Sequence, residues 1–206
     1  MLNAKQDEPN LTTDIPKAQF DYFKLYASIS KRFTLPRIEA PILLSGEMDS
    51  QCSKQTLYGT EQFAVGGYYS VRGFRENYIV GDNGYYFRNK ANVNVGSIIL
   101  PLIGKENLGL ISYLNKLSLE PFYDYGHVRV RASGEEGRLS GAGIKTIFGS
   151  KYFNASVTFS NALQKSKLIN SDKHENKMIY FEVSAVCCWN KVDVNSEWLC
   201  WVIDDN

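Results

Sequence analysis

The stretch Phe153-Asn154-Ala155-Ser156-Val157-Thr158-Phe159-Ser160 alternates apolar and polar side chains without interruption. Because successive side chains of an extended strand point to opposite faces, this period of two predicts a strand with one apolar and one polar face. The same pattern runs outward through residues 117–125 and 179–185, and further candidates are 20–33, 37–51, 84–97 and 138–149. Seven strands are therefore expected, and helical periodicity is nowhere sustained.

The lengths of these candidates and of their connections favour a membrane sheet. Several run beyond ten residues, more than the five or six that are usual in globular strands, and this length suits a tilted membrane span. Short connections at 34–36 and 149–151 alternate with long polar ones at 52–83, 127–137 and 165–176, as outer-membrane barrels do. We predict an all-β, antiparallel transmembrane β-barrel. A soluble β-sandwich binding module would show similar alternation and is kept as the alternative.

Composition removes several other classes of protein. The 206 residues carry 23 Lys plus Arg against 22 Asp plus Glu, and this balance predicts no nucleic-acid partner. The sequence contains no run of eighteen apolar residues, so it predicts no membrane-spanning helix. The two histidines, His127 and His174, belong to no nucleophile or metal signature. We therefore predict no enzyme, no catalytic residue, no metal site and no cofactor.

Two motifs identify a family. The long connection contains Gln62-Phe63-Ala64-Val65-Gly66-Gly67-Tyr68-Tyr69-Ser70-Val71-Arg72-Gly73-Phe74-Arg75-Glu76, and a later strand contains Phe122-Tyr123-Asp124-Tyr125-Gly126. Together they closely resemble the two-partner-secretion transporters of the hemolysin secretion/activation type, over residues 20–186. The resemblance implies about seven carboxy-terminal strands of a sixteen-strand outer-membrane pore. Such a pore contacts lipid and passes an unfolded hemolysin- or adhesin-type exoprotein; an outer-membrane protein assembly factor of the same superfamily is the alternative.

The same motifs indicate how the long connection is held. Asp124 lies on the polar face of its strand, and a guanidinium can bind a carboxylate through two parallel hydrogen bonds. We therefore predict a lumenal ion pair between Arg72 and Asp124. The supporting residues are Val71, Gly73 and Phe74 of the first motif, Phe122 and Gly126 of the second, and Gly66, Gly67 and Glu76 beside the first. Lys90 departs from the family, which often has an acidic residue at this place.

The faces of the last two strands predict which side chains contact lipid. Phe153, Val157, Phe159, Phe181 and Val183 are expected to face lipid, whereas Asn154, Ser156, Thr158, Tyr180 and Glu182 are expected to face the lumen.

Both ends of the chain differ from its middle. Residues 1–19 are expected to be disordered or residual, residues 20–189 to form the barrel portion, and residues 190–206 to be a tail outside the sheet. Cys187, Cys188 and Cys200 crowd near the end of the chain with all three tryptophans. Seven strands cannot close a barrel of the family's size, so we expect a fragment, a decayed gene or one half of a split transporter. The missing amino-terminal half would then be a partner.

Overall fold

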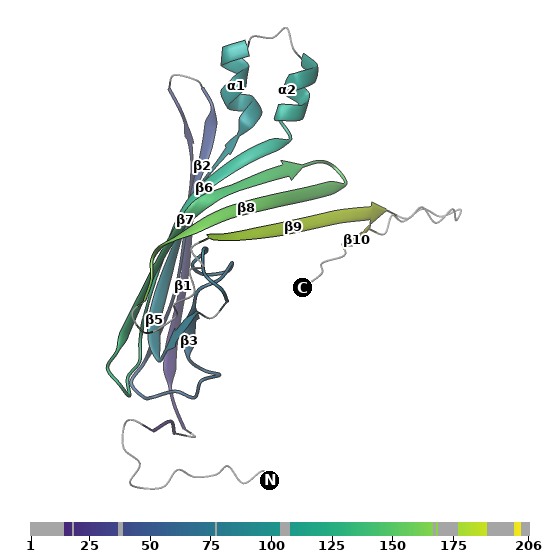
Figure 1. Cartoon of the computed structure of the whole chain (residues 1–206). Helices are drawn as coiled ribbons and strands as arrows, with labels where there is room; N and C mark the ends of the chain where they lie inside the picture. Colours follow the sequence, from purple (N-terminus) through teal and green to yellow (C-terminus); the bar gives the residue numbers. More distant parts are fainter. Residues whose placement is uncertain are drawn as a thin grey trace, which may run out of the picture.

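Seven long strands form one curved antiparallel sheet in the computed structural model, which describes residues 15–17, 19–36, 39–76, 78–103, 108–166, 168, 177–188 and 200–202. Each long strand pairs with the next long strand along the chain (Figure 1). The seven strands expected from the alternation are thus confirmed. Their bounds are β1 Tyr22–Thr34, β2 Pro41–Ser53, β5 Asn83–Asn94, β6 Leu117–Arg129, β7 Glu136–Gly149, β8 Phe153–Gln164 and β9 Lys177–Cys188.

The described residues form one large sheet and one two-stranded ribbon, in which β3 (Phe63–Val65) pairs with β4 (Ile79–Gly81). This arrangement does not match the soluble sandwich that the alternation left open, because a sandwich needs two large sheets packed face to face. No closure of the sheet into a ring is seen among the described residues.

Two helices interrupt the connection between β5 and β6, where the sequence predicted none. They are α1 (Val95–Ile103) and α2 (Leu108–Leu114). The strand expected over 84–97 therefore ends at Asn94, and this part of the prediction is wrong. The Asn94 side-chain oxygen accepts a hydrogen bond from the Ser97 backbone N–H at 3.1 Å, which caps the first turn of α1 and makes Asn94 the residue where the strand changes to helix. No helix in the described part of the chain is long and apolar enough to cross a membrane.

The expectation for the end of the chain also differs from the structure. Cys200–Val202 form β10, which pairs with the last three residues of β9. These three residues thus join the sheet, although 190–206 was expected outside it. An edge strand offers unpaired backbone donors and acceptors, and a nearby segment satisfies some of them by pairing. The other residues of 190–206, and residues 1–14 and 18 of the amino-terminal segment, lie outside the described residues.

Connections divide between the two ends of the sheet. The turns after β1 and β7 and the helices lie at one end, whereas β3 and the connection from β2 to β5 lie toward the other (Figure 1). The tight turns expected after β1 and β7 are confirmed, and so is the long connection from β2 to β5. The long connection expected at 127–137 is wrong, because β6 and β7 extend into it and leave only the short turn 130–135, and most of 165–176 lies outside the described residues. The helical connection lies on the tight-turn side. We call residues 54–82, which contain β3 and β4, the docked loop.

The docked loop covers one face of the sheet and builds the hydrophobic core against it. Phe63, Val65, Val71, Phe74 and Ile79 of the loop pack with Val128 of β6 and Leu139 of β7. The opposite face carries exposed apolar side chains: Phe159 is 51%, Phe181 73% and Val183 69% exposed. Three polar side chains of β8, by contrast, are buried: Ser156, Thr158 and Ser160. The sheet thus has an apolar outer face and a polar inner face covered by the loop.

Candidate functional site

Arg72 of the docked loop and Asp124 of β6 form the buried ion pair that the sequence predicted. The Arg72 Nε lies 2.7 Å from the Asp124 Oδ2, and Nη2 lies 2.9 Å from Oδ1. The Arg72 backbone N–H also donates to Oδ2 at 3.2 Å. Both side chains are almost fully buried, with 1% and 0% exposed. One carboxylate therefore binds both the side chain and the backbone of the loop, and lysine could not reproduce this geometry.

Two further side chains of β6 complete the setting of the guanidinium. The Phe122 ring lies under the Arg72 Cζ, with 3.4 Å between that atom and the ring centroid. In addition, Arg72 Nη1 lies 4.0 Å from Glu120 Oε1. Because alternate residues of a strand share a face, Glu120, Phe122 and Asp124 all point toward the loop. The inward phase expected for Asp124 is confirmed.

Glycine on the sheet lets the loop backbone come close. Asp124 lies opposite Gly141 of β7 in the strand register. A Cβ added to Gly141 would lie 1.9 Å from the carbonyl oxygen of Arg72, a distance that no side chain tolerates. Gly126, in the second motif, is similar, because its Cβ would meet Val65 and Val71 of the loop. The loop therefore rests directly on the backbone of β6 and β7.

Gly73 and Phe74 continue the loop across β8 and β9. Gly73 has a φ of +102°, which favours glycine, and a Cβ there would lie 2.9 Å from the backbone of Asn161 and Ala162. The Tyr180 hydroxyl of β9 accepts a hydrogen bond from the Gly73 N–H at 3.3 Å and donates to the Phe74 carbonyl at 3.1 Å. Phe74 itself is buried in the core. Gly73 thus permits the close approach of the loop backbone to β8, and Phe74 adds to the core between loop and sheet.

The residues around the first motif brace the tip of the loop. Gly66 N–H donates to the Ser70 hydroxyl at 2.8 Å, and Gly67 N–H donates to the Val71 carbonyl at 3.1 Å. Glu76 accepts a hydrogen bond from the Tyr68 N–H at 2.7 Å. These bonds lie within the loop, so the tip is a folded hook held by its own contacts.

Lys90, the departure from the family pattern, has a partner on the neighbouring strand. Its Nζ lies 3.5 Å from Glu47 Oε1 on β2, and Arg88 Nη1 lies 3.4 Å from the other oxygen of the same carboxylate. Arg88 stands between Glu47 and Asp124 in the strand register. Lys90 thus adds a positive charge to a row of alternating charges on the inner face.

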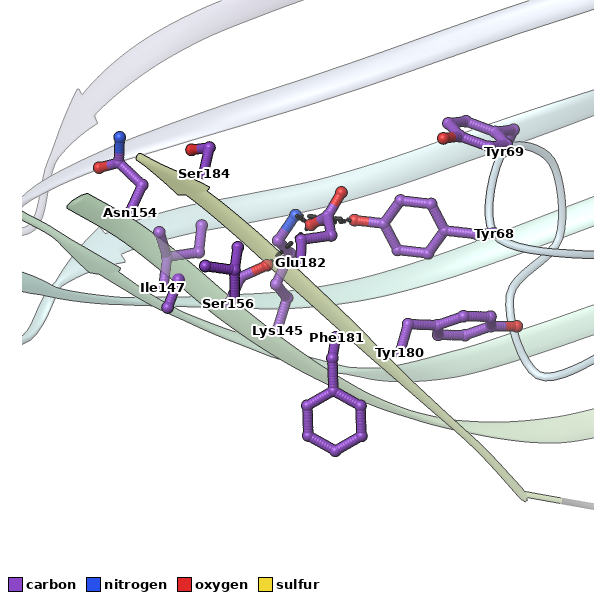
Figure 2. A pocket seen from close by; sticks show the side chains of 12 residues that line it. Tyr68, Tyr69, Lys145, Ile147, Asn154, Ser156, Tyr180, Phe181, Glu182 and Ser184 are labelled. Atoms are coloured by element: carbon purple, nitrogen blue, oxygen red, sulfur yellow. Dashed lines mark hydrogen bonds and ion pairs between the residues drawn. The ribbon is translucent and has the colours of Figure 1, made fainter. Parts of the chain in front are cut away.

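A second polar cluster connects the loop to β7, β8 and β9, and the sequence did not predict it. Three side chains surround one carboxylate oxygen of Glu182, as Figure 2 shows, and we call the four residues Tyr68, Lys145, Ser156 and Glu182 the Glu182 cluster. Glu182 Oε2 accepts from the Tyr68 hydroxyl at 2.6 Å and from the Ser156 hydroxyl at 2.7 Å, and it pairs with the Lys145 ammonium. Lys145 also donates to the Tyr68 oxygen at 2.7 Å.

The Glu182 cluster borders a cavity of about 620 Å³, lined also by Tyr69, Asn154 and Ser184. The Tyr68 ring packs on the Tyr180 ring, with 5.0 Å between centroids. Burial and the hydrogen bond to Glu182 raise the pKa of the Tyr68 hydroxyl, so this hydroxyl stays protonated and remains a donor at neutral pH. Alternation had placed Glu182 on the polar face, but nothing local pointed to Tyr68 as its partner.

Asp82 was also missed, and it anchors the base of the loop. Its fully buried carboxylate accepts from the Leu57 N–H at 2.7 Å and the Gln62 side chain at 3.3 Å through one oxygen. The other oxygen accepts from the Arg131 N–H at 2.7 Å. Asp82 therefore joins the docked loop to the connection between β6 and β7. Among the described residues, no group of His, Cys, Asp and Glu has a metal-binding arrangement.

The chain also matches a known family of proteins by sequence. Residues 1–146 match the family model described as haemolysin secretion/activation protein ShlB/FhaC/HecB. The chain belongs to this family of two-partner-secretion transporters, which are not enzymes.

Its relatives by sequence are outer membrane transporters named CdiB. The one from Dickeya dadantii (strain 3937) is 38% identical over 103 residues, or 50% of this chain and 17% of that protein. The one from Escherichia coli O6:K15:H31 is 38% identical over 91 residues, 44% of this chain and 14% of that protein. The chain thus matches only a small part of the length of these relatives.

Solved structures share the fold. CdiB from Acinetobacter baumannii superposes with a TM-score of 0.62 at 18% identity, covering 80% of this chain and 27% of that one. CdiB from Escherichia coli has a TM-score of 0.62 at 22% identity, covering 89% of this chain and 31% of that one. The curved sheet therefore corresponds to part of a CdiB structure.

Proposed function

We propose that this chain supplies seven adjacent strands and the docked loop of an outer-membrane pore that passes an unfolded exoprotein of hemolysin or adhesin type. The observation that carries the proposal is the buried Arg72–Asp124 pair, which holds a long loop on the polar face of the sheet. When the sheet curves around a channel, a loop on this face lies inside the channel, against its wall. Family membership and the outer-membrane relatives support this location.

The two faces of the sheet support the membrane setting. Large apolar side chains are exposed on the outer face, and the inner face carries charges and hydroxyls. Lipid provides an apolar environment for the first face, and a water-filled lumen solvates the second. β1 and the part of β9 that β10 does not cover require further strands, because unpaired backbone groups are costly in a bilayer. Those strands would come from the rest of a transporter, the amino-terminal half included.

The first test asks where the chain resides. The chain is produced in Escherichia coli behind an export signal, together with the remaining strands of CdiB from Escherichia coli as a separate chain that can pair with the open edges, and the outer-membrane fraction is examined for heat-modifiable gel mobility. We expect the protein in that fraction and soluble only in detergent. A monodisperse monomer that stays soluble without detergent would refute the proposal and restore a soluble binding module.

The second test asks whether the strands support transport. Residues 22–188 replace the corresponding strands of CdiB from Escherichia coli, and secretion of that transporter's own exoprotein into the medium is measured. We expect secretion from this chimera and its loss in the Arg72→Ala form. A chimera that inserts outer-membrane proteins but secretes nothing would favour the assembly-factor alternative.

A further inference from the structure

The docked loop is held to the sheet at two places that differ in burial. At the first, Arg72 and Asp124 are 1% and 0% exposed. At the second, the Glu182 side chain is 47% exposed and borders an open cavity, while Lys145 is 17% exposed. Water and mobile ions reach the second place and not the first, so the interactions at the second are weaker and easier to exchange.

The tip of the loop can leave the second place without unfolding. Its own backbone is bonded from Gly66 to Ser70, from Gly67 to Val71, and from Tyr68 to Glu76. Separation from Glu182 therefore breaks only side-chain contacts of Tyr68. The released hydroxyl and carboxylate both meet water in the cavity, so neither is left buried without a partner.

The Glu182 cluster also keeps its charge balance when Tyr68 leaves. Lys145 remains paired with Glu182, and Ser156 still donates to the same carboxylate oxygen. If Arg72 moved away instead, Asp124 would remain as an unpaired carboxylate in a buried site, and this is far more costly than the release of Tyr68. The two places thus differ in what it costs to open them, and the Arg72–Asp124 place is the more costly.

We propose that the Glu182 cluster is a releasable second anchor of the docked loop, which opens at Tyr68 while the Arg72–Asp124 pair stays closed and so controls passage along the inner face. This inference rests on the proposed function, because passage has meaning only in a pore. The opening itself is a property of this chain and can be measured without transport.

The first experiment measures the opening. In the full chain in detergent micelles, with native cysteines replaced by serine, spin labels are attached at Tyr69→Cys on the tip and Ser184→Cys on β9. Tyr68→Phe removes the hydroxyl and keeps the ring on Tyr180. We expect a second, longer distance between the labels, with a population about tenfold above that of the parent, as loss of a hydrogen bond to a charged group implies.

The matched control is Tyr152→Phe, which removes a hydroxyl from an exposed tyrosine in the turn after β7. It should leave the distance distribution unchanged. Glu182→Gln serves as a second variant and should show the same longer distance as Tyr68→Phe. A distribution in Tyr68→Phe and Glu182→Gln identical to that of the parent would overturn the releasable anchor.

The second experiment tests control of passage. In the cysteine-free chimera, Tyr68→Cys and Glu182→Cys are joined by a short bis-methanethiosulfonate cross-linker, which spans the distance between two long side chains and attaches through reducible disulfides. Secretion is measured before and after reduction, and we expect at least a tenfold loss that reduction reverses. Undiminished secretion with the cross-link formed would overturn the control of passage. A chimera that secretes nothing even when reduced would refute the proposed function, whereas the label distances would still decide whether the anchor opens.

Discussion

Arg72 and Asp124 are 52 residues apart in the chain, yet the guanidinium and the carboxylate meet through two hydrogen bonds of 2.7 and 2.9 Å. The carboxylate also accepts the backbone N–H of Arg72. Because water is excluded from this site, each charge depends on the other for its stabilisation. The pair therefore determines where the loop crosses the sheet, and it leads to the first prediction.

Arg72→Ala and Asp124→Ala should each impair secretion by the chimera. Each removes one partner of a buried pair and should destabilise loop docking by about 3–5 kcal/mol. The double variant should be no worse than additive, because it leaves no unpaired charge. Wild-type secretion from both single variants would contradict this account.

Gly141→Ala should displace the loop from β7. The new methyl group would lie 1.9 Å from the Arg72 carbonyl oxygen, and overpacking of this kind costs about 1–3 kcal/mol. The matched control is Gly59→Ala, where a Cβ meets nothing within 4 Å. Label distances between Tyr69→Cys and Ser184→Cys should broaden in the first variant and stay narrow in the second.

Asp82→Asn should loosen the base of the loop. The carboxylate accepts the N–H groups of Leu57 and Arg131 through different oxygens, so the amide places its NH₂ group against one of these donors. We expect a loss of about 1–3 kcal/mol at that bond. Hydrogen exchange at Leu57 or Arg131 should speed up accordingly. Asp49→Asn, a half-buried carboxylate on β2, is the control and should leave both amides unchanged.

The outer face should be accessible to lipid and the inner face to water. With native cysteines removed, Phe181→Cys in lipid vesicles should resist a membrane-impermeant maleimide, whereas Asn154→Cys beside the cavity should react. The opposite labelling pattern would reverse the assignment of the faces. Phe159→Arg should also reduce the folded fraction on heat-modifiable gels, because arginine facing mid-membrane lipid costs about 2–4 kcal/mol.

The local sequence determined the seven strands, because strand periodicity is a property of consecutive side chains. Residues 153–160 show the pattern without reference to any other part of the chain. The sequence did not predict the helices because their stretches are apolar, α1 contains Pro101, and no polar face shows a helical period. β10 was not predicted for another reason. Pairing of residues 200–202 is favourable only because the edge of β9 is open to them.

The Arg72–Asp124 pair could be predicted from the sequence because the two residues belong to two recognisable motifs and the alternation of β6 places Asp124 on the inner face. Asp82 and the Glu182 cluster were not, since their partners come from a loop and from strands that are distant in the chain. Tyr68 meets Glu182 across 114 positions, and no local period encodes that contact. Strand order and the path of the docked loop brought these groups together, because hydrogen bonds of this kind depend on distances that only the folded backbone sets.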